Sequence, residues 1–378
     1  MDPTQLIGPS TALGYPAPYW FMTILKVLGF TLHLVPMNLW FAGILVALLL
    51  RQNRNEHARR FSTRLMSQMP IIIALGINFG IVPLLFAQVA YYRVFYPATI
   101  LMAWPWLAVV FLLIFAYYGV YGYAVGLRDG RMTPERSTAG WMAAVLFIAI
   151  GFVFSNAFTL MTNLAAWPAL WQRHSIAGAA TGTALNLADP TLWPRWLMVF
   201  GLALTTTAAY AVVDAGLFAR REPDAYRRWV RGFAMRLYAV GAAWFAAVGS
   251  WYVFGTWGAE VRQVMFGGLT ALTAITTVAP ALPWLSILAQ RDGVTPGRAA
   301  ATGLLQVVVL ALNATSRQVV QNAELRRFVD VTSSRLDVQW SPLVLFLLLF
   351  VAGLVLVGWM VAQALEASRH PVAVAHKR

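Results

Sequence analysis

The sequence has 378 residues, of which 60% are hydrophobic and 11% charged, and its formal net charge is +14. A mean hydropathy of +0.65 and 16 tryptophans are typical of a polytopic helical membrane protein and exclude an ordinary soluble domain. Cysteine is absent, which excludes disulfides, cysteine-bound metals and covalently attached c-type haem in this chain.

The positive charge does not indicate a nucleic-acid partner. The arginines lie in short connections between apolar segments, where the positive-inside rule accounts for them. The first 18 residues, MDPTQLIGPSTALGYPAP, lack the basic start and short apolar core of a signal peptide. We therefore expect the first apolar segment to be retained as a membrane span.

Nine apolar segments follow one another along the chain, each long enough to cross a lipid bilayer. They cover residues 19–50, 67–92, 100–127, 139–163, 192–219, 232–257, 265–290, 299–316 and 341–366. No composition shift or low-complexity tract marks a second domain. The sequence predicts an all-α fold, a single transmembrane domain of residues 1–378 with about nine transmembrane helices.

Lysines and arginines divide the connections into two sets. The side reached after the first span carries 18 of them: Arg51, Arg54, Arg59, Arg60, Arg64, Arg128, Arg131, Arg136, Arg220, Arg221, Arg227, Arg228, Arg231, Arg291, Arg298, Arg369, Lys377 and Arg378. The opposite side carries eight: Arg93, Arg173, Arg195, Arg262, Arg317, Arg326, Arg327 and Arg335. This asymmetry predicts an N-terminus outside and a C-terminus inside, in a bacterial inner membrane.

The first span contains one lysine and one histidine. At helical spacing Lys26 and His33 share a face with Gly29, Met37 and Trp40, and this face should look into protein. His33 is the only one of five histidines inside an apolar segment, so any haem or metal chemistry that uses imidazole here must use His33. The alternative is a buried histidine bonded to a neighbouring helix, although ionisable groups inside membranes are functional candidates by default.

Other polar residues within the spans fall toward the predicted outer side. Gln88 lies near the outer end of span two, Asn156 and Asn163 in the outer half of span four, and Asn313 and Arg317 at the outer end of span eight. Together with Lys26 they predict a polar pocket that opens outward, with His33 beneath it near mid-membrane. The alternative is that these amides only bond across helix interfaces.

Two further polar residues of the spans lie away from this predicted pocket. Asn78 is central in span two, and Asp214 lies near the inner end of span five, where it could pair with Arg220 and Arg221.

Two of the predicted outer connections are long. The connections at residues 164–191 and 317–340 mix aromatic, basic and acidic side chains. We expect a partner to dock on them.

Several stretches, taken in order, resemble subunit I of cytochrome bd-type quinol oxidases. They are HLVPMNLWFAGILVALLL in span one, GINFG in span two, the AYY that closes it, FSNAFTLMTNLAAW in span four and, more weakly, SRQ at the end of span eight. The resemblance implies nine spans and an outside N-terminus. It implies a haem-ligand role for His33 and a place beside a haem for Arg317.

The chain departs from that family at four places. Span five opens LWPRWLMVFG without a histidine and span eight ends LNATSRQ without a methionine, so the family's low-spin haem should be missing unless Met198 is an unusual ligand. Span two lacks the family's glutamate, for which Gln88 is a neighbouring polar substitute. The family's long quinol-binding loop is replaced by a turn at residues 258–264.

The resemblance implies an integral-membrane subunit of a multisubunit respiratory or redox complex. Such a subunit would sit among other membrane subunits and link the quinone pool to an outer c-type cytochrome or iron–sulfur subunit. It would hold one haem b on His33, or a quinone near Lys26 and Gln88. An electron-relay subunit without its own catalysis fits as well as an enzyme. A haem-free structural anchor and a small-molecule transporter using the outer pocket are the alternatives.

The charge asymmetry makes the topology testable by reporter fusions. Fusions near Arg59 and Arg228 should report the inner side, and fusions near Arg173 and Arg327 the outer side, because short basic connections stay inside. Alkaline phosphatase and green fluorescent protein activities measure the two sides. An opposite result at any two of these sites would contradict the topology.

Overall fold

The computed structural model of the chain describes residues 1–219, 222–290 and 293–369 and is almost entirely helical. Its helices are α1 (Tyr19–Asn38), α2 (Ile44–Arg51), α3 (Glu56–Ala90), α4 (Tyr92–Leu101), α5 (Ala103–Arg128), α6 (Pro134–Thr162), α7 (Trp167–Arg173), α8 (Leu192–Val213), α9 (Asp224–Thr256), α10 (Ala259–Arg262), α11 (Thr270–Val278), α12 (Ala281–Leu288), α13 (Pro296–Leu325) and α14 (Trp340–Arg369). Shorter 3₁₀ turns cover Pro3–Leu6 and Leu164–Ala166. Three π-helical stretches, Leu39–Gly43, Asp214–Phe218 and Gln263–Gly268, continue α1, α8 and α10.

Within the described ranges, nine helical segments are long and apolar enough to cross a membrane. They are Tyr19–Arg51, Glu56–Ala90, Ala103–Arg128, Pro134–Thr162, Leu192–Phe218, Asp224–Thr256, Thr270–Leu288, Pro296–Leu325 and Trp340–Met360. This confirms the predicted fold class, an all-α polytopic membrane protein.

Several helices extend past the apolar segments that predicted them. Helix α3 begins at Glu56, eleven residues before the expected start at 67, because the Asn55 side chain accepts bonds from the His57 and Ala58 N–H groups. Helix α13 continues to Leu325 rather than ending at 316. Its last turns are rich in amide side chains, which lower the mean hydropathy of the segment although they are compatible with a helix.

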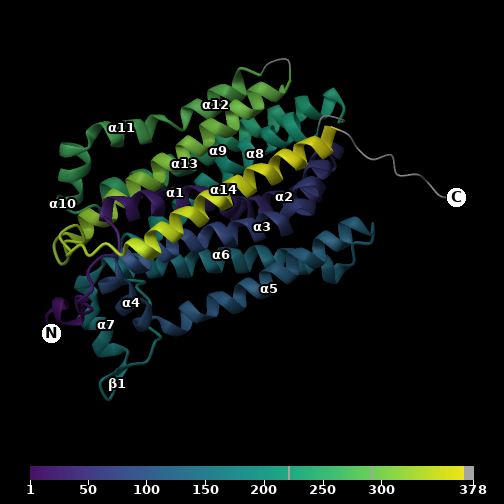
Figure 1. Cartoon of the computed structure of the whole chain (residues 1–378). Helices are drawn as coiled ribbons and strands as arrows, with labels where there is room; N and C mark the ends of the chain where they lie inside the picture. The colour runs from purple at the N-terminus through teal and green to yellow at the C-terminus, as the bar shows by residue number, and fades with distance from the viewer. Residues whose placement is uncertain (220–221, 291–292, 370–378) are drawn as a thin grey trace.

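Figure 1 shows the long helices running side by side as an elongated bundle. The N-terminus, α7, α10 and the β1–β2 hairpin lie at one end, and the C-terminal end of α14 lies at the other. Strands β1 (Ser175–Ile176) and β2 (Ala179–Ala180) pair antiparallel around Ala177 and Gly178, which both have positive φ as a tight hairpin requires. The predicted outer connections thus share one end of the bundle, and the side that this end faces stays a prediction.

Helices α8 and α9 pack most closely, through two glycines. A Cβ atom on Gly201 would lie 2.7 Å from the backbone nitrogen of Phe245, and one on Gly241 would lie 2.8 Å from the carbonyl oxygen of Gly201. Small residues let helix backbones approach in this way inside membranes, where dispersion contacts drive association.

A buried ion pair ties α3 to the inner end of α8. Arg64 donates to both carboxylate oxygens of Asp214, from Nε at 2.7 Å and from Nη2 at 2.8 Å. Asp214 is fully buried where the helix becomes π-helical. The partner that the structure describes for Asp214 is therefore Arg64 on α3. The expected partners Arg220 and Arg221 lie outside the described residues, as do Arg291, Lys377 and Arg378.

The N-terminal segment and the last outer connection hold each other at the predicted outer end. Tyr15 donates its N–H to the carbonyl of Arg335 at 2.8 Å and accepts from the Asp337 N–H at 3.0 Å. Within the same connection the Thr332 hydroxyl and N–H bond Asp330, which lowers the pKa of that carboxyl group. This connection is a structured surface, which suits it to docking.

The glycine contact between α8 and α9 predicts a large effect of one substitution. Gly241→Leu should lower the melting temperature of the detergent-solubilised protein and destabilise it by about 1–3 kcal/mol, because its side chain must displace backbone atoms of α8. Gly249→Leu is the matched control on the same helix, since a Cβ atom there meets nothing within 4 Å. Equal melting temperatures for the two variants would contradict the packing.

Candidate functional site

His33 lies on α1 facing α3, where its imidazole is held by one backbone group. Its Nδ1 is 2.8 Å from the carbonyl oxygen of Gly76. A carbonyl oxygen only accepts, so Nδ1 carries the proton and Nε2 of the neutral ring keeps its lone pair. No residue in the described part of the chain bonds Nε2. This is the arrangement that orients a metal-binding histidine, with one nitrogen fixed by a backbone carbonyl.

Two glycines of the GINFG stretch make room for two rings from α1 and its continuation. A Cβ atom on Gly80 would lie 2.8 Å from Cε1 of His33, and one on Gly76 would lie 2.0 Å from Cζ3 of Trp40. The two rings also touch each other edge to face, with centroids 5.6 Å apart. Side chains larger than hydrogen at either glycine would push the imidazole and the indole off α3.

Arg317 reaches the neighbourhood of His33 from α13. Its guanidinium carbon is 4.9 Å from the ring centroid of Phe30 and 5.3 Å from that of Phe158 on α6. The ring of Phe30 is in turn 6.5 Å from that of His33. Arg317 is exposed, and it forms no hydrogen bond or ion pair with any residue that the structure describes. Its five N–H groups are therefore available to an anionic group.

Lys26 lies two turns nearer the predicted outer end of α1 and is half-buried. Its ammonium group donates to Oε1 of Gln318 at 2.8 Å and to Oε1 of Gln321 at 3.1 Å. It also lies 4.3 Å from the ring centroid of Tyr91. The described surroundings of this group are thus two amide oxygens and an aromatic face, without a carboxylate.

The Asn322 side chain joins three helices beside Lys26. Its Oδ1 accepts bonds from the Tyr19 hydroxyl at 3.0 Å, the Tyr91 hydroxyl at 2.6 Å and Nε2 of Gln318 at 3.1 Å. The Gln318 amide also bonds the Tyr91 hydroxyl. Sequence reasoning missed this cluster, although the amides at 318, 321 and 322 follow helical spacing and could have indicated a shared face.

The remaining candidates do not join one pocket. Gln88 is half-buried near the end of α3, and no hydrogen bond within the described residues links it to Lys26. Asn156 is buried on α6, where its Oδ1 accepts the Asn186 N–H at 3.0 Å and so ties the helix to the following connection. Asn313 is half-buried without a side-chain bond to a described residue. Asn78 is exposed and donates to the carbonyl of Ala74 in its own helix.

An ion pair closes the same end of the bundle. Arg195 in the first turn of α8 pairs with Glu324 near the end of α13, and its Nε donates to the Tyr252 hydroxyl at 2.9 Å. Within the described residues, no carboxylate forms a hydrogen bond or ion pair with Lys26 or Arg317.

Two features around His33 are ones that a haem b site would need. Nε2 of the imidazole has no described hydrogen-bond partner, and Arg317 carries N–H donors that a carboxylate could accept. No group of three or more histidine, aspartate or glutamate residues that could hold a bare metal ion occurs among the described residues. The candidate functional site is therefore defined by His33, Arg317 and Lys26.

Fold and composition define the class of protein, a polytopic helical membrane protein. No protein-family model matches this chain, and no curated protein sequence matches it. A finer assignment depends on the residues of the candidate site.

The Asn322 cluster predicts a measurable loss of stability. Asn322→Ala should lower the melting temperature in detergent and cost about 1–3 kcal/mol, because it leaves two tyrosine hydroxyls and one amide without their shared acceptor. Asn78→Ala is the control, since that amide is exposed and bonds only its own helix. If both variants have the melting temperature of the unchanged protein, the cluster does not stabilise the fold.

Proposed function

We propose that the chain is an integral-membrane redox subunit, similar to subunit I of cytochrome bd-type quinol oxidases, that holds one haem b through His33. The observation that carries the proposal is the bond between Nδ1 of His33 and the Gly76 carbonyl, which leaves Nε2 available for iron. A histidine that served helix packing alone would have no need to leave this nitrogen unbonded inside a membrane.

The stretches that resemble the family converge on this imidazole. His33 and Trp40 come from HLVPMNLW, Gly76 and Gly80 from GINFG, and Phe158 from FSNAF. The rings of His33 and Trp40 contact each other and pack on the two glycines, while Phe158 lies near Arg317. This convergence supports a shared role for the residues that carry the resemblance.

The side chains around the proposed site would favour the reduction of a haem bound there. The carbonyl of Gly76 fixes the tautomer and the orientation of the imidazole, and the rings of Phe30 and Trp40 limit the access of water. Arg317 and Lys26 add two positive charges in a medium of low dielectric constant, where such charges act strongly. A haem bound here would supply one-electron chemistry, and these cations would raise its reduction potential.

The proposed electron partners follow from the resemblance and from the predicted outer surface. The structured connections at residues 164–191 and 326–339 offer a docking surface to a c-type cytochrome or an iron–sulfur subunit, and other membrane subunits would pack against the apolar helices. The quinone pool of a bacterial inner membrane would be the other electron partner. In this role the chain relays electrons within a complex.

A haem-free structural subunit is the second candidate function. The observation that favours it is the set of polar ties at one end of the bundle, Asn322 with two tyrosines and Arg195 with Glu324. These ties hold the helices that carry the docking surface and need no cofactor for that purpose. A subunit of this kind would anchor a partner without relaying electrons.

A pyridine haemochrome spectrum separates the two candidates. The purified chain should show haem b, and His33→Ala should abolish it while the helical circular dichroism stays near that of the unchanged protein, because the variant removes the iron ligand but keeps the helices. His174→Ala is the control, since that ring lies in the outer hairpin and its Nδ1 contacts the Thr183 hydroxyl.

Two results would overturn the haem assignment. One is an unchanged chain that carries no haem b after expression with added haem precursor. The other is a His33→Ala variant that keeps the spectrum. The first result would favour the structural role, and the second would show that the haem has a ligand other than His33.

A further inference from the structure

Several arginines at the predicted inner end of the bundle are held by carboxylates or backbone carbonyls of the chain. These are Arg60, Arg64, Arg136, Arg231 and Arg298. Two arginines of α9 differ from them. Arg228 and Arg236 are exposed, and neither forms a hydrogen bond or ion pair with a residue that the structure describes. Their charges are therefore available to a group that the described chain does not supply.

Arg228 and Arg236 lie on one i, i+4 row of α9, with Gly232 between them. We call these three residues the arginine row. A Cβ atom on Gly232 would meet nothing within 4 Å, so the space beside it is open. Helical side chains lean toward the N-terminus of their helix, which directs Arg236 toward this space. The Cα atoms of the two arginines are about 12 Å apart along the axis, so one small anionic group in the gap can meet both guanidinium groups.

The acidic residues nearest in the sequence do not supply that group. Glu222 pairs with Arg60 at 2.8 Å, and Asp224 pairs with Arg227 at 3.7 Å. Helix α9 contains no carboxylate besides Asp224. The anion that meets the arginine row must therefore come from another molecule.

The arginine row lies at the depth of the lipid headgroups. From Arg236 to the end of α9 at Thr256 the helix rises about 30 Å, which is the thickness of the hydrocarbon core. Arg236 therefore lies at the boundary of the core, where an arginine extends its charged end toward the interface. Arg228 lies two turns nearer to water. The two guanidinium groups thus bracket the layer in which lipid phosphates lie.

The same row of α9 becomes apolar beyond Arg236. Val240 is 58% exposed and Trp244 43% exposed. The indole N–H of Trp244 donates to the carbonyl of Leu197 on α8 at 2.8 Å, which holds this ring against the helix surface. A molecule that follows the row therefore needs an anionic head next to an apolar tail. An anionic phospholipid has this structure, whereas free phosphate lacks the tail.

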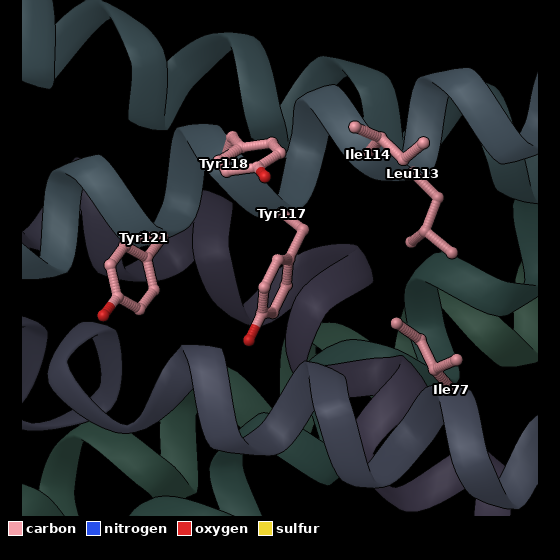
Figure 2. Close-up of a pocket in the computed structure, with 6 residues that line it drawn as sticks. All are labelled: Ile77, Leu113, Ile114, Tyr117, Tyr118 and Tyr121. Carbon is pink, nitrogen blue, oxygen red and sulfur yellow. The ribbon is translucent and has the colours of Figure 1, made fainter.

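A hollow beside α5 lacks the charge that α9 carries. It lies between α3 and α5 and has a volume of about 480 Å³. Its lining, shown in Figure 2, contains no charged side chain and consists of Ile77, Leu113, Ile114, Tyr117, Tyr118 and Tyr121. Such a hollow can accept an acyl chain of any lipid, whereas the arginine row distinguishes lipids by the charge of the headgroup.

We propose that the arginine row binds an anionic phospholipid, with its phosphate over Gly232 between the two guanidinium groups and an acyl chain along Val240 and Trp244. Guanidinium groups bind phosphate oxygens through paired N–H donors. Two positive charges complement a headgroup of net negative charge, such as phosphatidylglycerol, better than a zwitterionic one. The proposal does not depend on the haem assignment, because none of these residues belongs to the candidate functional site.

Native mass spectrometry of the full chain, titrated in detergent with dioleoylphosphatidylglycerol, tests the proposal. Arg228→Gln with Arg236→Gln should raise the Kd about thirtyfold, because two charged contacts to the headgroup are lost. Gly232→Leu keeps the charge and should also raise the Kd, because its side chain fills the gap. The matched control is Arg54→Gln with Arg128→Gln, which removes the same charge from two exposed arginines outside the row. This control should bind the lipid as the unchanged protein does.

The proposal is overturned if the control pair raises the Kd as much as the pair in the arginine row, because the lipid would then respond only to the total charge. Equal binding of dioleoylphosphatidylcholine would also overturn it, because acyl chains alone would then account for the binding. Glycerophosphoglycerol, the same headgroup without acyl chains, should not compete at the concentration of the lipid. Equal competition would overturn the lipid assignment in favour of a soluble phosphodiester, and an unchanged Kd for Gly232→Leu would contradict the position of the phosphate.

Discussion

The close approach of α1 to α3 depends on two hydrogen atoms, the side chains of Gly76 and Gly80. Because nothing larger stands at these positions, the indole of Trp40 and the imidazole of His33 lie directly on the helix backbone. The same approach brings Nδ1 of His33 within bonding distance of the Gly76 carbonyl. One steric constraint therefore sets the packing of two spans and the orientation and tautomer of the only histidine within the described apolar spans.

The charged side chains at the two ends of the bundle are stabilised in different ways, because an unpaired charge is costly in a medium of low dielectric constant. At one end Asp214 and Arg64 neutralise each other in a two-bond pair, as a fully buried carboxylate requires. At the other end Glu324 pairs with Arg195, while Lys26 is held by neutral amides and Arg317 by aromatic faces.

The spans were predictable from sequence, because hydropathy over about 20 residues depends on composition alone. The ends of α3 and α13 were not, since polar side chains continue a helix beyond the bilayer. Helical spacing placed Lys26 and His33 on one face, but it could not name the opposing helix. This is why Gln318 and Asn322 were missed as neighbours of Lys26, and why Arg64 was missed as a partner of Asp214.

The amides within the spans show that sequence alone does not reveal the hydrogen-bond partner of a polar side chain. Asn78 and Asn156 look alike in sequence, each a single amide in an apolar span, yet one bonds its own helix at the lipid surface and the other ties a buried helix to a connection. An amide can satisfy itself locally on the carbonyl four residues earlier, so its presence in a span does not establish a site. Convergence of several polar groups from different helices is the stronger signal.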